Sequence, residues 1–160
     1  MKLMDRRIEP RHVLPFEMRP VPQALVLELL NHAVWAPNHR LREPWKFIYI
    51  ANDNREGLEF FHKQVPAHLI VTMKNESDAY KHDENLAAVF CLIQNFKLLA
   101  WEKKLGVNVS FYDWMFDRGV CQKLGIPEKE RIAAVLDLGF YLEIPEAKPA
   151  SVASLKWRLL

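Results

Sequence analysis

Apolar residues recur at two different spacings in the first half of the chain, and each spacing predicts a type of element. Between Pro22 and Trp35 they fall at helical intervals, and the proline suits a first helical turn. We therefore expect a helix that ends before Ala36-Pro37. Trp45 to Ala51 and Ala67 to Met73 alternate in the manner of β-strands. A short helix is expected between these strands, at about Asn54 to His62.

The longest helical stretch runs from Asp83 to Leu105 without a proline or glycine and is apolar nearly all round as far as Trp101. It is followed by Gly106, a typical helix stop, just after a basic last turn. A helix of this kind belongs in the centre of a fold, where neighbours cover every side. Because one short chain offers it few neighbours, the pattern favours a dimer.

The remaining pattern completes an α+β order of elements. Val107 to Phe111 predicts a short strand, Asp117 to Leu124 a helix, and Arg131 to Phe140 a strand. From Ile144 onward the chain reads as an extended tail that needs another surface to lie on. With no internal repeat and no linker, residues 1–160 are expected to form a single domain.

Charge and composition exclude several partners. The 22 basic and 20 acidic residues are interspersed, so the net charge of +2 forms no polybasic stripe and nucleic acid is not an expected partner. No apolar run reaches the roughly 20 residues that span a bilayer, so we expect no membrane association. The N-terminus lacks the apolar region of a secretory signal, which predicts a cytoplasmic protein.

Several chemical signatures are absent from the sequence. It contains no GxGxxG motif, no P-loop and no GxSxG elbow, which leaves Rossmann, triphosphatase and hydrolase chemistry without support. The six histidines show no ligand spacing, so no metal site is expected. Cys91 and Cys121 form neither a redox motif nor a metal pair, and both are expected to be buried reduced thiols.

Polar side chains concentrate in one loop, from Ala36 to Trp45, between the first helix and the first strand. Its amide, imidazole and guanidinium groups could donate hydrogen bonds to an acceptor-rich ring or to an anion. The same composition also fits a solvated connection whose prolines stop the helix. The loop by itself leaves both readings open.

Four segments taken together resemble the nitroreductase family. Ala33 to Ile50 (AVWAPNHRLREPWKFIYI) is similar to the family's helix, Ala-Pro loop, Gln-Pro-Trp and strand. Leu86 to Gly106 resembles the family's central helix and its glycine exit. Leu124 to Glu128, followed by Ile132 to Gly139, is similar to the penultimate helix and last strand. The segments stand in the family's order with nearly normal spacings over most of the chain.

The resemblance implies a nitroreductase-like α+β fold. In that fold a central mixed or antiparallel sheet is flanked by helices around a long buried central helix, and an extended C-terminal tail is exchanged in a dimer. It further implies a homodimeric flavoprotein with FMN at the interface. Such an oxidoreductase takes hydride from NAD(P)H and passes it, by a ping-pong exchange, to a small nitroaromatic or quinone-like acceptor. Family members usually have no dedicated acid or base, so no residue is named as catalytic.

The resemblance also assigns candidate flavin contacts. The family's N-terminal arginine segment falls on Arg11-His12, with Arg6-Arg7 as the alternative register, and a guanidinium suits the FMN phosphate. A backbone stretch along the flavin corresponds to Val109, Ser110 and Phe111. Lys148 matches a basic residue near the phosphate and equally fits a surface charge. The loop contributes the remaining candidates, which are Asn38, His39, Arg40 and Glu43.

Glu43 departs from the family, which usually has glutamine there. Its carboxylate could accept a hydrogen bond from the ring yet oppose negative charge on it, or turn outward and pair with Arg40 or Arg42. The departures at Pro10, His12 and Glu43 leave a flavin-binding regulator or reservoir without turnover as the alternative function. Flavin chemistry on another substrate, as in dehalogenating or flavin-fragmenting relatives of this fold, is a third possibility.

Overall fold

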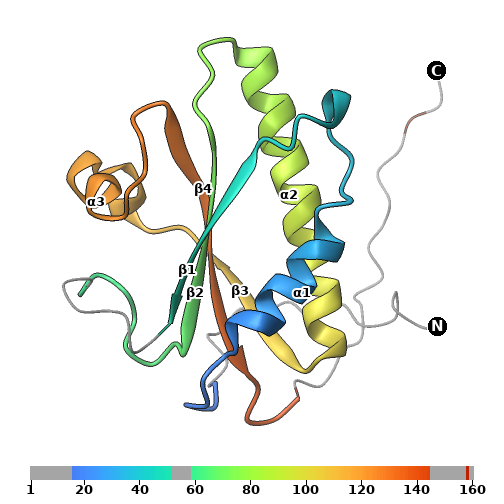
Figure 1. Cartoon of the computed structure of the whole chain (residues 1–160), viewed down its shortest axis with the longest axis vertical. Coiled ribbons are helices and arrows are strands. Elements are labelled where there is room, and N and C mark those ends of the chain that lie inside the picture. The colour runs from blue at the N-terminus through green and yellow to red at the C-terminus, as the bar shows by residue number, and fades with distance from the viewer. Residues whose placement is uncertain (1–15, 52–58, 145–157, 159–160) are drawn as a thin grey trace.

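The computed structural model of the chain describes residues 16–51, 59–144 and 158. Its centre is a sheet of four strands: β1 (Trp45–Ala51), β2 (Ala67–Lys74), β3 (Leu105–Ser110) and β4 (Glu130–Phe140). They lie in the order β1-β2-β4-β3, and every neighbouring pair is antiparallel (Figure 1). Of the two expected forms, mixed or antiparallel, the sheet is therefore antiparallel.

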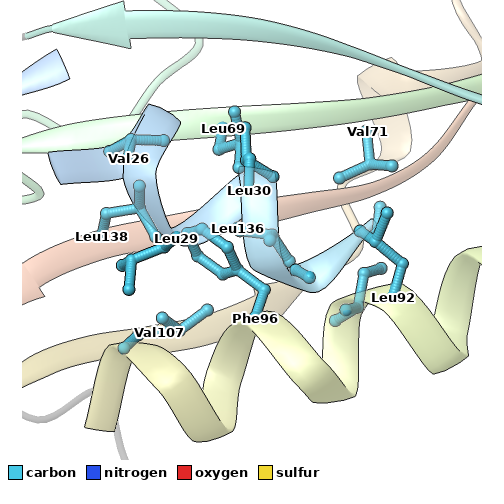
Figure 2. Close-up of a cluster of buried hydrophobic side chains, with 14 of the residues drawn as sticks. Val26, Leu29, Leu30, Leu69, Val71, Leu92, Phe96, Val107, Leu136 and Leu138 are labelled. Carbon is cyan, nitrogen blue, oxygen red and sulfur yellow. The ribbon is translucent and has the colours of Figure 1, made fainter. Parts of the chain in front are cut away.

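Two helices, α1 (Gln23–Ala33) and α2 (Ala79–Glu102), cover one face of this sheet (Figure 1). Their apolar side chains interdigitate with those of the strands in the main core, and a fully buried Leu or Phe contributes about 1.5–3 kcal/mol. Figure 2 shows residues of α1, α2 and three strands in this core: Val26, Leu29, Leu30, Leu69, Val71, Leu92, Phe96, Val107, Leu136 and Leu138.

The other face is covered by smaller elements: the 3-10 helix η3 (Asp113–Phe116), the helix α3 (Arg118–Lys123) and part of the segment before β2. The apolar residues of this second cluster are Ile50, Phe61, Ile70, Met115, Cys121, Ile126, Ile132 and Val135. Because both faces are covered, β2 is buried along its whole length except at Lys74.

The helix α2 differs from its expected form. It begins at Ala79, where the carboxylate of Asp78 accepts a hydrogen bond from the Lys81 N–H, and it ends at Glu102, before Leu105 opens β3. The helix is not buried on every side, because an exposed stripe runs along the side away from the core. The residues of this stripe are Ala87, Cys91, Gln94 and Leu98. Cys91 is thus exposed, contrary to expectation, whereas Cys121 is buried.

Other boundaries move by a few residues. The expected strands at Val107 and Arg131 begin at Leu105 and Glu130, and the helix expected from Asp117 begins one residue later, with Asp117 as its cap. Of the helix expected between β1 and β2, residues 52–58 lie outside the described residues, and 59–62 form a turn and a bend rather than a helix. The 3-10 helix η3 was not expected. The tail from residue 145 lies outside the description except at Arg158.

Candidate functional site

The loop between α1 and β1 is closed by Asn38. Its Nδ2 donates to the Ala36 carbonyl at 3.1 Å, and its Oδ1 accepts from the Glu43 N–H at 3.0 Å. A single short side chain therefore joins the start of the loop to its end. Asparagine suits this position because its amide both donates and accepts.

Three residues of the same loop adopt left-handed backbone conformations. The φ angles are 52° at Arg40, 52° at Leu41 and 46° at Glu43, and none of these residues is a glycine. Such conformations cost of order 1–3 kcal/mol each and persist where the surroundings fix them. The sequence predicted a loop here, and the structure adds a 3-10 turn, η1 (His39–Leu41), within it.

The loop runs beside α2 (Figure 1), and side-chain contacts fasten it there. Nδ1 of His39 lies 3.0 Å from Oε1 of Glu84 on α2, and Nδ2 of Asn95 donates to the Ala33 carbonyl at the end of α1 at 3.5 Å. The first of these contacts is charge-assisted when the imidazole is protonated. The position of the loop thus depends on the long helix as well as on its own turns.

The charged side chains of the loop face solvent. Arg40, Arg42 and Glu43 are all exposed. Within the part of the chain that the structure describes, neither arginine pairs with Glu43 or with any other carboxylate. Two guanidinium groups are therefore available to bind an anion from outside the loop, beside one carboxylate that no cation neutralises.

The second expected segment, Val109 to Phe111, lies at the end of β3. Side chains alternate here, as they do in strands, so Val109 packs against the main core while Ser110 points to the other face. Phe111 is 65% exposed, and its ring stacks on Phe90 of α2 with centroids 6.3 Å apart and an interplanar angle of 23°. The segment therefore presents a flat aromatic face beside α2.

Ser110 does not turn its hydroxyl toward that aromatic face. Its Oγ donates to Oδ2 of Asp137 at 2.6 Å and accepts from Nδ2 of Asn108 at 3.1 Å. The carboxylate belongs to a buried polar cluster with His68 that sequence reasoning missed. The available signal was the interruption of two apolar strands, at His68 in AHLIVTM and at Asp137 in AAVLDLGF.

The helix α2 brings the two expected segments into one neighbourhood. The loop contacts α2 at Glu84 and the strand end contacts it at Phe90, six residues on. Six residues correspond to about 9 Å along a helix axis. Three further candidates, Arg11, His12 and Lys148, lie outside the described residues, so their part in the site stays a prediction.

The donor set indicates what this neighbourhood can bind. Exposed guanidinium groups favour phosphate or carboxylate oxygens, and an exposed aromatic face favours a flat ring. A planar, acceptor-rich heteroaromatic molecule with an anionic group combines both properties.

Within residues 16–51, 59–144 and 158, no three His, Cys, Asp or Glu side chains gather as a metal ion would require. No helix in this part of the chain is long and apolar enough to cross a membrane.

One curated protein is similar to the chain over most of its length. "Putative NAD(P)H nitroreductase YfhC" of Bacillus subtilis (strain 168) is 33% identical over an alignment that covers 86% of this chain and 84% of that protein. No family model matches the chain. Because this alignment covers most of both chains, common descent explains why four segments of the chain resemble the nitroreductase family.

Solved structures share the fold. The crystal structure of a nitroreductase-like family protein from Bacillus cereus has a TM-score of 0.83 and 28% identity, covering 98% of this chain and 92% of that chain. A structure from Desulfovibrio desulfuricans, described as a putative nitroreductase in complex with FMN, has a TM-score of 0.76 and covers 94% and 92% of the two chains. At 18% identity, this second likeness shows the fold alone.

Proposed function

The chain belongs to the nitroreductase family, and from that premise we propose that it is an FMN-dependent oxidoreductase. In this proposal it takes hydride from NAD(P)H and passes it, by a ping-pong exchange, to a small nitroaromatic or quinone-like acceptor. The observation that carries the proposal is the fastening of the loop and of the strand end to one helix, with arginines and an aromatic face exposed. FMN, when bound, supplies the hydride chemistry.

The chain's own residues bind and orient the cofactor. The free guanidinium groups of Arg40 and Arg42 are the described cations suited to oxygen atoms of FMN. The backbone from Val109 to Phe111 would lie along the ring. Asn38 holds the loop in its strained shape, so the polar groups of the loop would face the flavin ring without reorganising at each turnover.

We also propose that two copies of the chain form the site. The exposed stripe of α2, with Ala87, Cys91 and Leu98, lacks an apolar partner among the described residues, and a second copy would cover it. In this proposal FMN lies at the interface of a homodimer, and the two copies exchange their C-terminal tails. The tail itself lies outside the described residues.

The decisive experiment uses the purified full-length chain. We expect a yellow protein whose flavin absorbance bleaches anaerobically with NADH or NADPH and returns when a nitroaromatic or quinone acceptor is added. Varying both substrates should give the parallel double-reciprocal lines of ping-pong kinetics.

The other outcomes separate the alternatives. Yellow protein that neither nicotinamide bleaches would contradict the reductase and indicate a flavin-binding regulator or reservoir. Bleaching without reoxidation by any acceptor of these classes would direct attention to flavin chemistry on another substrate. Protein that binds no FMN from a saturating solution would overturn the proposed function altogether.

A further inference from the structure

A buried carboxylate lies at the centre of a polar cluster on the sheet face opposite α1 and α2. Asp137 of β4 is 4% exposed, and its Oδ1 lies 2.7 Å from Nδ1 of His68 on β2, which is fully buried. Its Oδ2 accepts hydrogen bonds from Oγ of Ser110 at 2.6 Å and from the hydroxyl of Tyr112 at 3.0 Å. One side chain therefore joins three strands.

The cluster holds Asp137 in its ionised form. Burial by itself would raise the pKa of this carboxyl, but hydrogen bonds from His68, Ser110 and Tyr112 and the charge of His68 together lower the pKa below its ordinary value. A buried carboxylate with several donors costs far less than an unpaired one. The donors of the cluster thus offset much of the cost of placing an acid in the centre of the strand.

The arrangement is not that of a hydrolytic triad. Asp137 occupies the centre, and the hydroxyl of Ser110 donates to this carboxylate rather than to the imidazole of His68. The opposite nitrogen of His68, Nε2, is buried and has no hydrogen-bond partner among the residues that the structure describes. Because the carboxylate, and not the imidazole, binds the Ser110 hydroxyl, the contacts indicate a structural anchor.

The anchor acts on the two residues that flank Phe111. Ser110 and Tyr112 are two positions apart, so both side chains point to the face where Asp137 lies, and the side chain between them points to the other face. There Phe111 stacks on Phe90 of α2. Hydrogen bonds on both sides of Phe111 thus fix which face this segment presents to the proposed cofactor.

We propose that Asp137 is the positioning residue of the FMN-binding segment, holding Val109 to Phe111 in register against α2 through Ser110 and Tyr112. This inference rests on the proposed function, because it takes FMN to lie along that segment. It adds a residue on the far face of the sheet, which the family resemblance does not assign, to the determinants of cofactor binding.

The test compares variants that remove the anchors one at a time. Tyr112→Phe and Ser110→Ala each delete one donor and leave the other contacts of Asp137 in place, while Asp137→Asn removes the charge with little change of shape. Tyr112→Phe is the cleanest of the three, because Ser110 is itself a candidate flavin contact. Glu130→Gln is the matched control, since Glu130 is the other buried acid of β4 and bonds to Thr72 and Lys46 at the far end of the strand.

Each variant is titrated with FMN by quenching of flavin fluorescence, and the visible spectrum of the bound flavin and the Tm are recorded. We expect Tyr112→Phe and Ser110→Ala to weaken FMN binding about 3- to 10-fold, as loss of one hydrogen bond would. Asp137→Asn should weaken it more than tenfold and shift the flavin absorption band. Glu130→Gln should lower the Tm but keep the affinity and the spectrum of the native chain.

Each outcome decides the proposal. Unchanged affinity and spectrum in Tyr112→Phe and Ser110→Ala, with a lower Tm alone, would show a structural role and overturn it. These two variants decide the matter even if Asp137→Asn does not fold. Native protein that binds FMN, beside variants that bind it equally well, refutes only this inference. Native protein that binds no FMN refutes the proposed function and this inference with it.

Discussion

Asn38 is the residue on which the shape of the loop depends. Removing its side chain releases both ends of the loop and the left-handed conformations of Arg40, Leu41 and Glu43 between them. We predict that Asn38→Ala weakens FMN binding about tenfold, a loss of about 1.4 kcal/mol, measured by flavin fluorescence. Asn31→Ala, at an exposed position on α1, is the control and should bind FMN like the native chain. Equal affinity in both variants would exclude the loop from the site.

Glu43 allows a test by redox potential. Its exposed carboxylate has no cation partner among the described residues, so beside the ring it would oppose the negative charge that the cofactor gains on reduction. We predict that Glu43→Gln raises the midpoint potential by roughly 30 mV, which corresponds to about 1.4 kcal/mol for two electrons. Equilibrium dye reduction measures this shift, with Glu128→Gln before β4 as the control. Identical potentials in all three proteins would remove Glu43 from the site.

The raised pKa of Tyr112 determines how this residue affects the stability of the fold at alkaline pH. Burial, followed by the charge of Asp137, raises the pKa of Tyr112 from its ordinary value of 10.0 to about 12. Because the folded pKa is the higher one, this contribution to stability is complete below pH 10 and is lost as the pH rises toward 12. Thermal unfolding between pH 9 and 12 should therefore show a shallower alkaline decline for Tyr112→Phe than for the native chain. Tyr80→Phe, at an exposed position, should keep the native decline.

At the scale of elements, Gly106 of β3 and Gly139 of β4 are paired and lie against Phe16, so neither position has room for a side chain. A Cβ on Gly139 would lie 2.3 Å from Cγ of Phe16 and 2.5 Å from its Cβ, and the position of that Cβ is fixed by the backbone. We predict that Gly139→Ala destabilises the fold by about 1–3 kcal/mol in denaturant unfolding. Gly119→Ala, where the nearest atom is a carboxylate oxygen at 3.1 Å, should change stability much less. Equal losses would contradict this close packing.

At the scale of the whole molecule, the stripe on α2 determines the expected assembly. Leu98 is 40% exposed on the side of α2 that no described element covers, whereas Phe116 is exposed on the other face of the sheet. We predict that the native chain and Phe116→Glu sediment as dimers at micromolar concentration, and that Leu98→Glu sediments as a monomer with weaker FMN binding. A folded native monomer that still binds FMN would contradict the shared site.

The sequence alone determined the order of the four strands and three α-helices that the structure describes, and the family. Hydrophobic spacing located α1 and β1 to within two residues, because helix and strand periods are local properties of the chain. The family resemblance also rested on contiguous segments and is confirmed by the relative from Bacillus subtilis. The helix expected before β2 was wrong in its described part, because a local pattern does not include the aromatic packing of Phe60 and Phe61 on Trp114.

Only the tertiary structure decided which polar residues meet. His68 and Asp137 are 69 positions apart, and no local pattern pairs them, yet antiparallel register places them opposite each other. Likewise, the contact of His39 with Glu84 depends on α2 passing the loop. The exposed stripe of α2 appeared only once α1 and the sheet had covered its other sides, because a residue is buried by its neighbours in space, whereas a sequence pattern records its neighbours along the chain.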